Sequence, residues 1–115
     1  MPAKKTDLKP VFSVVAPVFN EIGCVEEFYK TVSSVMQLLK QPWELVLVDD
    51  GSTDGSTDKI QELSFGDPLV KPIIFARNFG HQIAVTAGLD YARGDAVIII
   101  DADLQDPPAV MLDLI

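Results

Sequence analysis

Short apolar runs alternate with longer amphipathic stretches along this chain of 115 residues. An apolar run of about four to eight residues, bounded by turn-forming residues, predicts a buried strand. Such runs occupy 11–16, 43–48, 72–76 and 96–100. Because they are largely apolar throughout instead of alternating with polar residues, both faces of each strand are expected to be covered.

The first predicted helix opens at Asn20 and Glu21 and stops before Pro42. Its apolar residues recur at helical spacing, so one face is expected to pack in the core. This stripe consists of Val25, Phe28, Tyr29, Val32, Val35, Met36 and Leu39. In the connection after the second strand, the serines and threonines of 51–58 can cap a short helix over about 57–63.

A third helix presents Ile83, Ala87 and Tyr91 on one face, and Gly94 is placed to terminate it. After the last strand, a helical pattern starts again at Ala109. The alternation of strands and helices predicts an α/β fold, a parallel sheet covered by helices on both faces. Right-handed crossovers would place the carboxyl end of every strand along one edge of that sheet.

Length, composition and charge narrow the class of protein. With 48% hydrophobic residues, the chain is expected to form one packed domain over 11–115, after a flexible polar leader over 1–10. Its net charge of -8 argues against a nucleic-acid partner, which needs a basic surface. The single cysteine, Cys24, excludes an internal disulfide and fits a reducing compartment. The sequence has neither a signal-peptide pattern nor an apolar run long enough to span a bilayer, so a cytoplasmic location is expected.

Unusual polar residues follow each of the four predicted strands. Open α/β sheets bind ligands at the carboxyl edge of their strands, so these residues are expected to form one site. They are Asn20 and Glu21 after the first strand, together with the apolar Pro17, then Asp49 and Asp50 after the second, Arg77 and Asn78 after the third, and Asp101 and Asp103 after the fourth.

Asp101 and Asp103 stand two residues apart at the end of the fourth strand, with the small Ala102 between them. On extended chain both carboxylates would point the same way, and they would repel each other unless a cation held them together. Oxygen ligands favour a hard ion such as Mg2+ or Mn2+, and Gln105 continues the alternation and can add a neutral oxygen. The alternative is an acidic turn that caps the next helix, which the Asp-Pro-Pro of 106–108 could form by itself.

The other residues at this edge allow two interpretations each. Asp49 and Asp50 can accept hydrogen bonds from a ribose hydroxyl or a base N–H, or can form the turn before the following glycine. Arg77 suits a bidentate contact with a phosphate, or a structural ion pair with Asp49 or Asp101. His81 lies near the start of the third helix, where backbone N–H groups favour anions, so it is either a diphosphate contact or a structural residue.

Neither a Gly-x-Gly-x-x-Gly after the first strand nor a Gly-Lys-Ser/Thr loop occurs, which removes the main support for dinucleotide and P-loop sites. Other motifs carry a resemblance: Ala-Pro-Val-Phe-Asn-Glu at 16–21, Val-Asp-Asp-Gly-Ser-Thr-Asp at 48–54, Ala-Arg-Asn-Phe-Gly at 76–80 and Ile-Asp-Ala-Asp-Leu-Gln-Asp-Pro-Pro at 100–108. With them, the chain resembles the N-terminal half of family 2 glycosyltransferases over 11–115. More narrowly, it resembles the polyprenyl-phosphate and dolichyl-phosphate sugar transferases, including bactoprenol glucosyltransferases.

The resemblance implies the N-terminal part of a GT-A fold, with a Rossmann-like sheet, that binds a nucleotide-diphosphate sugar of the UDP-glucose or GDP-mannose type. It implies that a divalent metal, Mg2+ or Mn2+, is held by Asp101, Asp103 and Gln105 and neutralises charge on the departing nucleoside diphosphate. Asp103 and Arg77 become the candidate catalytic residues, Arg77 by positioning a phosphate. The candidate substrate-binding residues are Pro17, Asn20, Glu21, Asp49, Asp50, Arg77, Asn78, His81, Asp101 and Ala102.

The resemblance further implies transfer with inversion to a lipid phosphate such as a polyprenyl phosphate, by a catalytic domain that runs past Ile115. A longer parent protein could then work at the cytoplasmic face of the membrane. An open sheet edge and an uncovered face would also favour a homo-oligomer. Two alternatives stay open, a nucleotide-binding module without transfer activity and a phosphorelay receiver domain. The receiver would need an acidic pair after its first strand and a lysine after a fifth, and this sequence offers neither.

Overall fold

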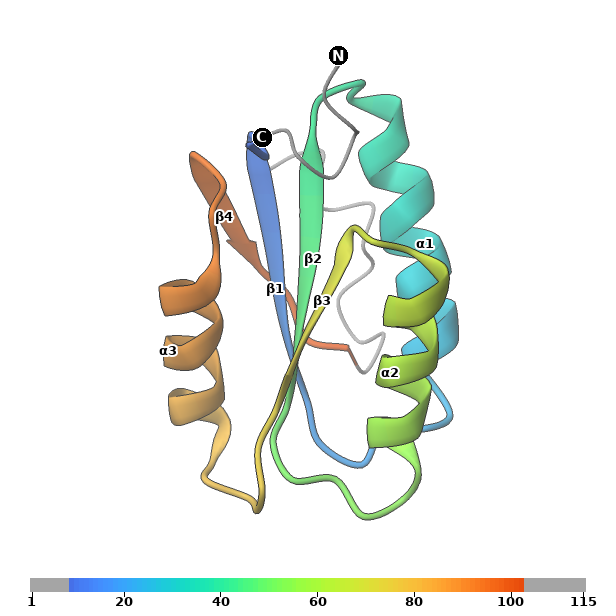
Figure 1. Cartoon of the computed structure of the whole chain (residues 1–115), viewed down its shortest axis with the longest axis vertical. Helices are drawn as coiled ribbons and strands as arrows, with labels where there is room; N and C mark the ends of the chain where they lie inside the picture. The colour runs from blue at the N-terminus through green and yellow to red at the C-terminus, as the bar shows by residue number, and fades with distance from the viewer. Residues whose placement is uncertain (1–8, 103–115) are drawn as a thin grey trace.

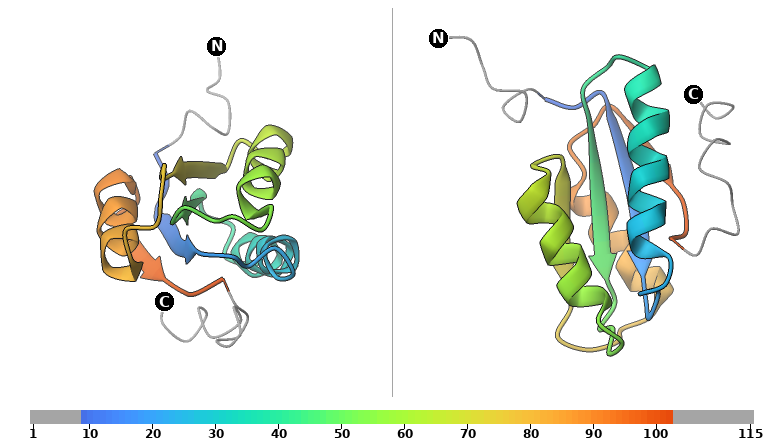
Figure 2. Two further views of the ribbon diagram at one scale, coloured as in Figure 1. Left: turned by 90° about the horizontal axis from the view of Figure 1, so that it is seen from below. Right: turned by 90° about the vertical axis from the view of Figure 1, so that its right-hand side faces the viewer.

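The computed structural model describes residues 9–102, which form four strands and three helices. In chain order they are β1 (Phe12–Val18), α1 (Val25–Leu38), β2 (Trp43–Asp49), α2 (Ser56–Gly66), β3 (Val70–Ile74), α3 (His81–Tyr91) and β4 (Ala96–Ile99). All paired strands are parallel. Helices α1 and α2 lie on one face of the sheet and α3 lies on the other (Figures 1 and 2). The predicted α/β fold with helices on both faces is confirmed.

The strands are arranged in the order β3-β2-β1-β4. This is the Rossmann-type order, whereas receiver domains use the order 2-1-3-4-5, so the receiver alternative is excluded. From β1 the chain first moves to β2 and β3 through α1 and α2, and then returns through α3 to β4 on the other side of β1. The order therefore reverses at β1, and open α/β sheets bind ligands in the crevice at such a point.

Apolar side chains form one layer on each face of the sheet. The larger layer joins α1 and α2 to the sheet and includes the fully buried Phe28, Met36 and Leu45. The smaller layer lies under α3 and includes Val48 and Ala84. All residues of the predicted stripe on α1 belong to the larger layer or pack against it, which confirms that prediction.

Helix α3 approaches the sheet through small residues. Ala84 and Gly88 are buried, whereas Ile83 and Tyr91 are 50% and 47% exposed. A Cβ placed on Gly88 would lie only 2.3 Å from Cγ1 of Val15. The helix therefore lies too close to β1 for a residue larger than glycine at position 88, and of the face predicted from Ile83, Ala87 and Tyr91 only Ala87 packs against the core.

Helix α1 begins at Val25, later than predicted, because the chain before it is held as a loop. Asn20 adopts a positive φ of 52°, outside the helical region. The backbone N–H groups of Asn20, Glu21 and Ile22 donate to side chains in the connection between β2 and α2. Their acceptors are Ser52 Oγ, Ser56 Oγ and Asp54 Oδ2, at 2.9, 3.0 and 3.1 Å respectively.

The ends of α2 and β3 also differ from the prediction. Helix α2 begins after Gly55, whose φ is 101°, and no serine or threonine side chain caps it. Strand β3 covers Val70–Ile74 instead of 72–76, so Pro72 lies in its middle. The N–H of Phe75 donates to the Asp49 carbonyl of β2. In a strand the backbone polar groups of alternate residues point to the same side, so those of Phe75 and Ile73 point toward β2 and the backbone nitrogen of Pro72 points outward. A proline is tolerated there because β3 is an edge strand.

Helix α3 ends at Tyr91, so Gly94 does not terminate it. The Gly94 N–H instead donates to Ser13 Oγ at 2.7 Å and fixes the turn that leads into β4. The helix predicted from Ala109 and most of the predicted leader lie outside the described residues. Within 9–102, every helix is too short or too polar to span a membrane.

Candidate functional site

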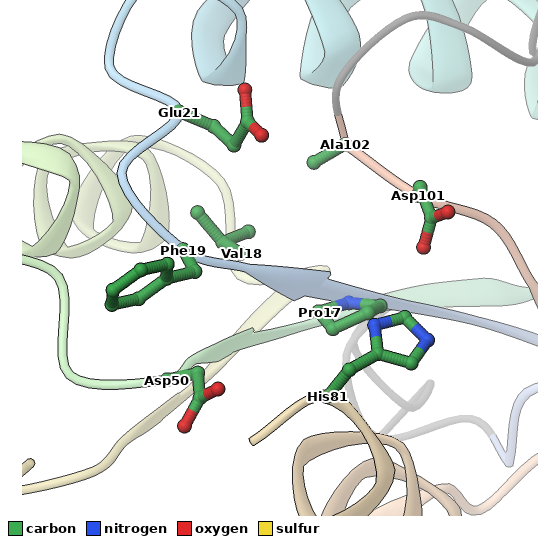
Figure 3. A pocket seen from close by; sticks show the side chains of 8 residues that line it. All are labelled: Pro17, Val18, Phe19, Glu21, Asp50, His81, Asp101 and Ala102. Atoms are coloured by element: carbon green, nitrogen blue, oxygen red, sulfur yellow. The ribbon is translucent and has the colours of Figure 1, made fainter. Parts of the chain in front are cut away.

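A pocket of about 260 Å³ lies at the carboxyl edge of the sheet. Its walls come from the end of β1 and the loop after it, the end of β2, the start of α3 and the segment after β4. The lining residues are Pro17, Val18, Phe19, Glu21, Asp50, His81, Asp101 and Ala102. Figure 3 shows the end of β1 crossing this pocket, with Asp50 and His81 on one side and Glu21, Asp101 and Ala102 on the other. Six predicted substrate-binding residues are thus brought together: Pro17, Glu21, Asp50, His81, Asp101 and Ala102.

Pro17 accounts for the opening between β1 and β4. Strand β1 pairs with β2 as far as Val18 but with β4 only as far as Val15. The N–H of Ile100 donates to the Val15 carbonyl, so the odd-numbered residues of β1 face β4. Pro17 is the next such residue and has no N–H to continue the ladder. The predicted end of the first strand at position 16 was therefore wrong, since the strand continues through Pro17 to Val18 along β2.

The loop after β1 and the loop after β2 are held together by reciprocal hydrogen bonds. The N–H of Asn20 donates to Ser52 Oγ at 2.9 Å, and the N–H of Thr53 donates to Asn20 Oδ1 at 2.8 Å. Asn20 does not line the pocket, but this contact fixes the backbone next to Glu21, which does. A contact between Asn20 and a substrate stays a prediction.

Asp49 is fully buried, and both of its carboxylate oxygens are bound within the chain. Oδ1 accepts a hydrogen bond from the Ser52 N–H at 3.0 Å, and Oδ2 accepts one from the Thr57 hydroxyl. These bonds tie the end of β2 to the first turn of α2. This geometry supports the turn interpretation of Asp49, and its contact with a nucleotide stays a prediction.

Asp50 lines the pocket although it is only 3% exposed. Its carboxylate accepts hydrogen bonds from the Asn78 side chain and from the backbone N–H groups of Phe79 and Gly80. Asn78 is thereby directed toward Asp50 and is not among the residues that line the pocket. Asp50, predicted after β2, and Asn78, predicted after β3, therefore bind each other.

Arg77 lies outside the pocket and stacks on an aromatic ring. Its Cζ lies 4.0 Å from the centroid of the Phe79 ring, and its Nη1 donates to the Asn78 carbonyl at 3.3 Å. No ion pair joins Arg77 to Asp49 or Asp101 within 9–102. The ion-pair interpretation is thus not observed, and a contact between Arg77 and a phosphate stays a prediction.

Of the predicted metal ligands, only Asp101 lies in the described part of the chain; Asp103 and Gln105 lie outside it. No group of three histidine, cysteine or acidic side chains that could hold a metal ion occurs between residues 9 and 102. Asp101 does share the pocket with Glu21. Carboxylate oxygens are the ligands that hard divalent cations prefer, so the chemistry of this pocket fits such an ion.

Two residues that line the pocket were not predicted as site residues, Val18 and Phe19. Phe19 is 46% exposed, which is high for a large aromatic side chain. An aromatic residue directly after a strand and directly before the polar Asn20 and Glu21 is a signal that could have identified it. Val18 is an apolar strand residue like its neighbours, and nothing in the sequence distinguishes it.

The sequence model of glycosyl transferase family 2 matches residues 13–115. The chain belongs to this family. Family 2 glycosyltransferases are enzymes, and the resemblance inferred from the four motifs is confirmed. Relatives at half identity include an uncharacterized glycosyltransferase, YkcC, of Bacillus subtilis, 52% identical over 104 residues. The bactoprenol glucosyl transferase of Shigella phage SfV is 50% identical over 103 residues.

Each of these two family 2 proteins is matched over 90% of this chain, but the match spans only 32% and 34% of their own lengths. Among solved structures, the mannosyltransferase PcManGT from Pyrobaculum calidifontis, in complex with GDP-Man and Mn2+, superposes with a TM-score of 0.76 at 26% identity. That match covers 96% of this chain and 32% of the other. The expected N-terminal part of a GT-A fold is thereby confirmed.

Proposed function

We propose that this chain binds the nucleotide-diphosphate sugar of a family 2 glycosyltransferase, and that the protein transfers the sugar to a polyprenyl phosphate. One observation carries the proposal. The pocket at the carboxyl edge gathers Glu21, His81 and Asp101 from three separate segments, in a chain half identical to a bactoprenol glucosyl transferase. The solved relative with GDP-Man and Mn2+ supports the same class of donor.

The pocket has groups suited to different parts of the donor. His81 is the first residue of α3, no residue of the first turn is acidic, and the Asp50 carboxylate binds only the N–H groups of Phe79 and Gly80 just before the helix. The N–H groups of the first turn, which have no partner within the helix, can therefore donate to the diphosphate there. Phe19, nearly half exposed at the pocket, offers a flat apolar face to the base. A volume of about 260 Å³ holds only a part of such a ligand, so the rest of the donor extends beyond the described residues.

A divalent metal ion, Mg2+ or Mn2+, is part of the proposal. Asp101, Asp103 and Gln105 would hold it through oxygen atoms. When bound, the ion supplies positive charge that stabilises the negative charge developing on the leaving nucleoside diphosphate. Glu21 faces the same pocket as Asp101, so its carboxylate adds to the negative potential that attracts a cation.

The acceptor chemistry follows from the lipid phosphate. A phosphate oxygen is already anionic, so it can attack the anomeric carbon without a strong general base. The new bond from this oxygen forms on one face of the anomeric carbon while the bond from the carbon to the diphosphate breaks on the opposite face. The nucleoside diphosphate leaves, and the anomeric configuration inverts. Arg77, as the exposed cation near this edge of the sheet, is the proposed contact for a donor or acceptor phosphate. Since the lipid resides in the membrane, we place the reaction at its cytoplasmic face.

The test is a calorimetric titration of this chain with UDP, GDP, UDP-glucose and GDP-mannose, in Mn2+ and in chelator. We expect one nucleotide to bind only with metal, and Asp101→Asn and Asp103→Asn each to weaken that binding at least tenfold. Asp58→Asn, at an exposed position on α2, is the matched control and should bind like the wild type. Unchanged affinity in both site variants would contradict the metal site. Radiolabelled transfer to undecaprenyl phosphate by the full-length protein separates an enzyme from a binding module.

A further inference from the structure

The loop 19–24, between β1 and α1, carries two residues of the pocket. Phe19 and Glu21 both line it, and Figure 3 shows the Glu21 side chain extending from this loop toward the segment of Ala102. The loop is neither helix nor strand. Its backbone polar groups must therefore find partners in other segments, and those partners determine how the loop approaches the pocket.

The backbone of Glu21 is bound at both of its polar groups. Its carbonyl accepts from the N–H groups of Cys24 and Val25, at 2.9 and 3.0 Å, where α1 begins. Its N–H donates at 3.0 Å to Oγ of Ser56, the first residue of α2. Because the backbone sets the direction of the bond from Cα to Cβ, these contacts determine where the Glu21 side chain leaves the loop.

Asp54 binds the hydroxyl group that receives the Glu21 N–H. The Ser56 hydroxyl has one proton, which it donates to Asp54 Oδ1 at 2.6 Å, so its lone pairs remain available to the Glu21 N–H. The same Oδ1 accepts from the Ser56 N–H at 3.0 Å, and Oδ2 accepts from the Ile22 N–H at 3.1 Å. One carboxylate therefore holds two successive residues of the loop, Ile22 directly and Glu21 through Ser56.

The two partners of the loop lie outside the pocket. Neither Asp54 nor Ser56 is among the described residues that line it. Ser56 is fully buried, so its hydroxyl depends on partners within the protein. Asp54 is exposed, yet both of its oxygens accept hydrogen bonds, and bonds to a charged acceptor are about twice as strong as neutral ones.

We propose that Asp54 is a positioning residue for donor binding, which acts by fixing residues 21 and 22 and thereby the Glu21 side chain at the pocket. This inference rests on the proposed function, because the nucleotide-diphosphate sugar is the ligand that the positioned loop would help to bind. The role of Asp54 is confined to the loop, since its hydrogen bonds go to the loop and to the first residue of α2.

The test uses two variants that each remove one link. Asp54→Asn keeps the size of the side chain, but its amide nitrogen cannot accept a hydrogen bond, so either Ile22 or Ser56 loses its acceptor. Ser56→Ala removes the acceptor of the Glu21 N–H alone. Amide hydrogen exchange without ligand, resolved at Glu21 and Ile22 by NMR, reports the loop. Calorimetric titration with UDP and GDP in Mn2+ reports binding.

Two control variants separate the loop from charge and from stability. Asp58→Asn makes the same change of charge at an exposed position of α2. Val35→Ala removes buried volume near the carboxyl end of α1, in the larger core layer, and so lowers stability without touching the loop. We expect both controls to bind the nucleotide like the wild type. If Val35→Ala weakened binding as much as Asp54→Asn, the effect would come from stability, and the proposal would be overturned.

We expect both loop variants to speed exchange at Glu21 or Ile22 and to weaken nucleotide binding about three- to tenfold, the range for one lost hydrogen bond. Weaker binding with unchanged exchange would indicate that Asp54 acts on the ligand by another route, and faster exchange with unchanged affinity would show that the site does not depend on the loop. Either result would overturn the proposal. If the wild type binds neither nucleotide, the proposed function fails for this chain and this inference fails with it, whereas equal binding by the wild type and Asp54→Asn refutes the inference alone.

Discussion

Gly51 is the position at which one added methyl group should do the most damage to the site. It follows Asp50 and has a φ of 74°, in the left-handed region. A Cβ built on it would lie 2.2 Å from the carbonyl carbon of Arg77 and 2.4 Å from the backbone nitrogen of Asn78. Since these are backbone atoms, the loop after β3 cannot avoid the methyl group by a side-chain rotation. Gly51→Ala must move the loop itself.

The cost of Gly51→Ala has two parts that a second glycine separates. A left-handed conformation costs an alanine about 1–2 kcal/mol, and overpacking a tight contact costs about 1–3 kcal/mol. Gly55 also has a positive φ, of 101°, but a Cβ there would meet only the Ile22 side chain at 3.7 Å. We therefore expect Gly55→Ala to lose about 1–2 kcal/mol and Gly51→Ala about 2–5 kcal/mol.

Urea unfolding followed by circular dichroism measures these free energies. Gly23→Ala is the control for both, because a Cβ at Gly23 meets nothing within 4 Å. The Gly51 variant should also show faster hydrogen exchange over 77–80, since that is the loop that its methyl group displaces. If the free energy of unfolding lost by Gly51→Ala were within about 0.5 kcal/mol of that lost by Gly55→Ala, the reasoning would be refuted. The contact with the backbone of 77–78 would then contribute no measurable cost.

Two further substitutions, one of them with a matched control, test the core and a partly buried hydrogen bond. Phe28→Ala should lose about 3–5 kcal/mol because the ring is fully buried, whereas Phe65→Ala, at 93% exposure, should change the free energy of unfolding by less than about 0.5 kcal/mol. The Tyr29 hydroxyl donates to Asp67 Oδ2 at 2.6 Å, and this bond, followed by burial and the Asp67 charge, raises the pKa of Tyr29 to about 12. The neutral phenol therefore stabilises the fold below pH 10.0, and this contribution is lost as the pH rises toward 12. Tyr29→Phe should lower the free energy of unfolding by about 0.5–1.5 kcal/mol near neutral pH and should remove its dependence on pH between 10 and 12. Urea denaturation at several pH values measures both effects. A variant with the same free energy of unfolding as the wild type at every pH would contradict both expectations.

Local pattern was sufficient for the elements whose structure depends on their own residues. The stripe of α1 and the apolar runs of β1 and β2 predicted buried surfaces, and most of their residues, such as Val14, Phe28 and Leu45, are fully buried. Alternation of strands and helices was sufficient for the parallel sheet and for the edge at which polar residues meet. These inferences hold because periodicity and crossover handedness are properties of the chain alone.

Contacts between distant segments account for most of what the sequence did not predict. Asn20 and Glu21 were assigned to a helix, but their N–H groups bind side chains more than thirty residues away, at separations of 32 and 35. Similarly, α3 packs on the sheet through Ala84 and Gly88, and the closeness of Gly88 to Val15 of β1 is a contact between segments that no local pattern predicts. Asp50 follows the same rule, since its partners lie 28 to 30 residues further along the chain.

Pro17 shows how a residue that ends a strand by local rules can make a site by its place in the sheet. The register of β1 and β4 pairs Val15 with Ile99, so one more step of two residues would pair position 17 with Asp101. A residue with an N–H at position 17 could extend the ladder and hold Asp101 within the sheet. Proline cannot donate that hydrogen bond, so the pairing ends and Asp101 is left to face the pocket. Pro17 and Asp101, which are distant in sequence, therefore act together. Because Pro17 has no N–H to donate, the ladder between β1 and β4 ends before Asp101, and the Asp101 carboxylate can face the pocket.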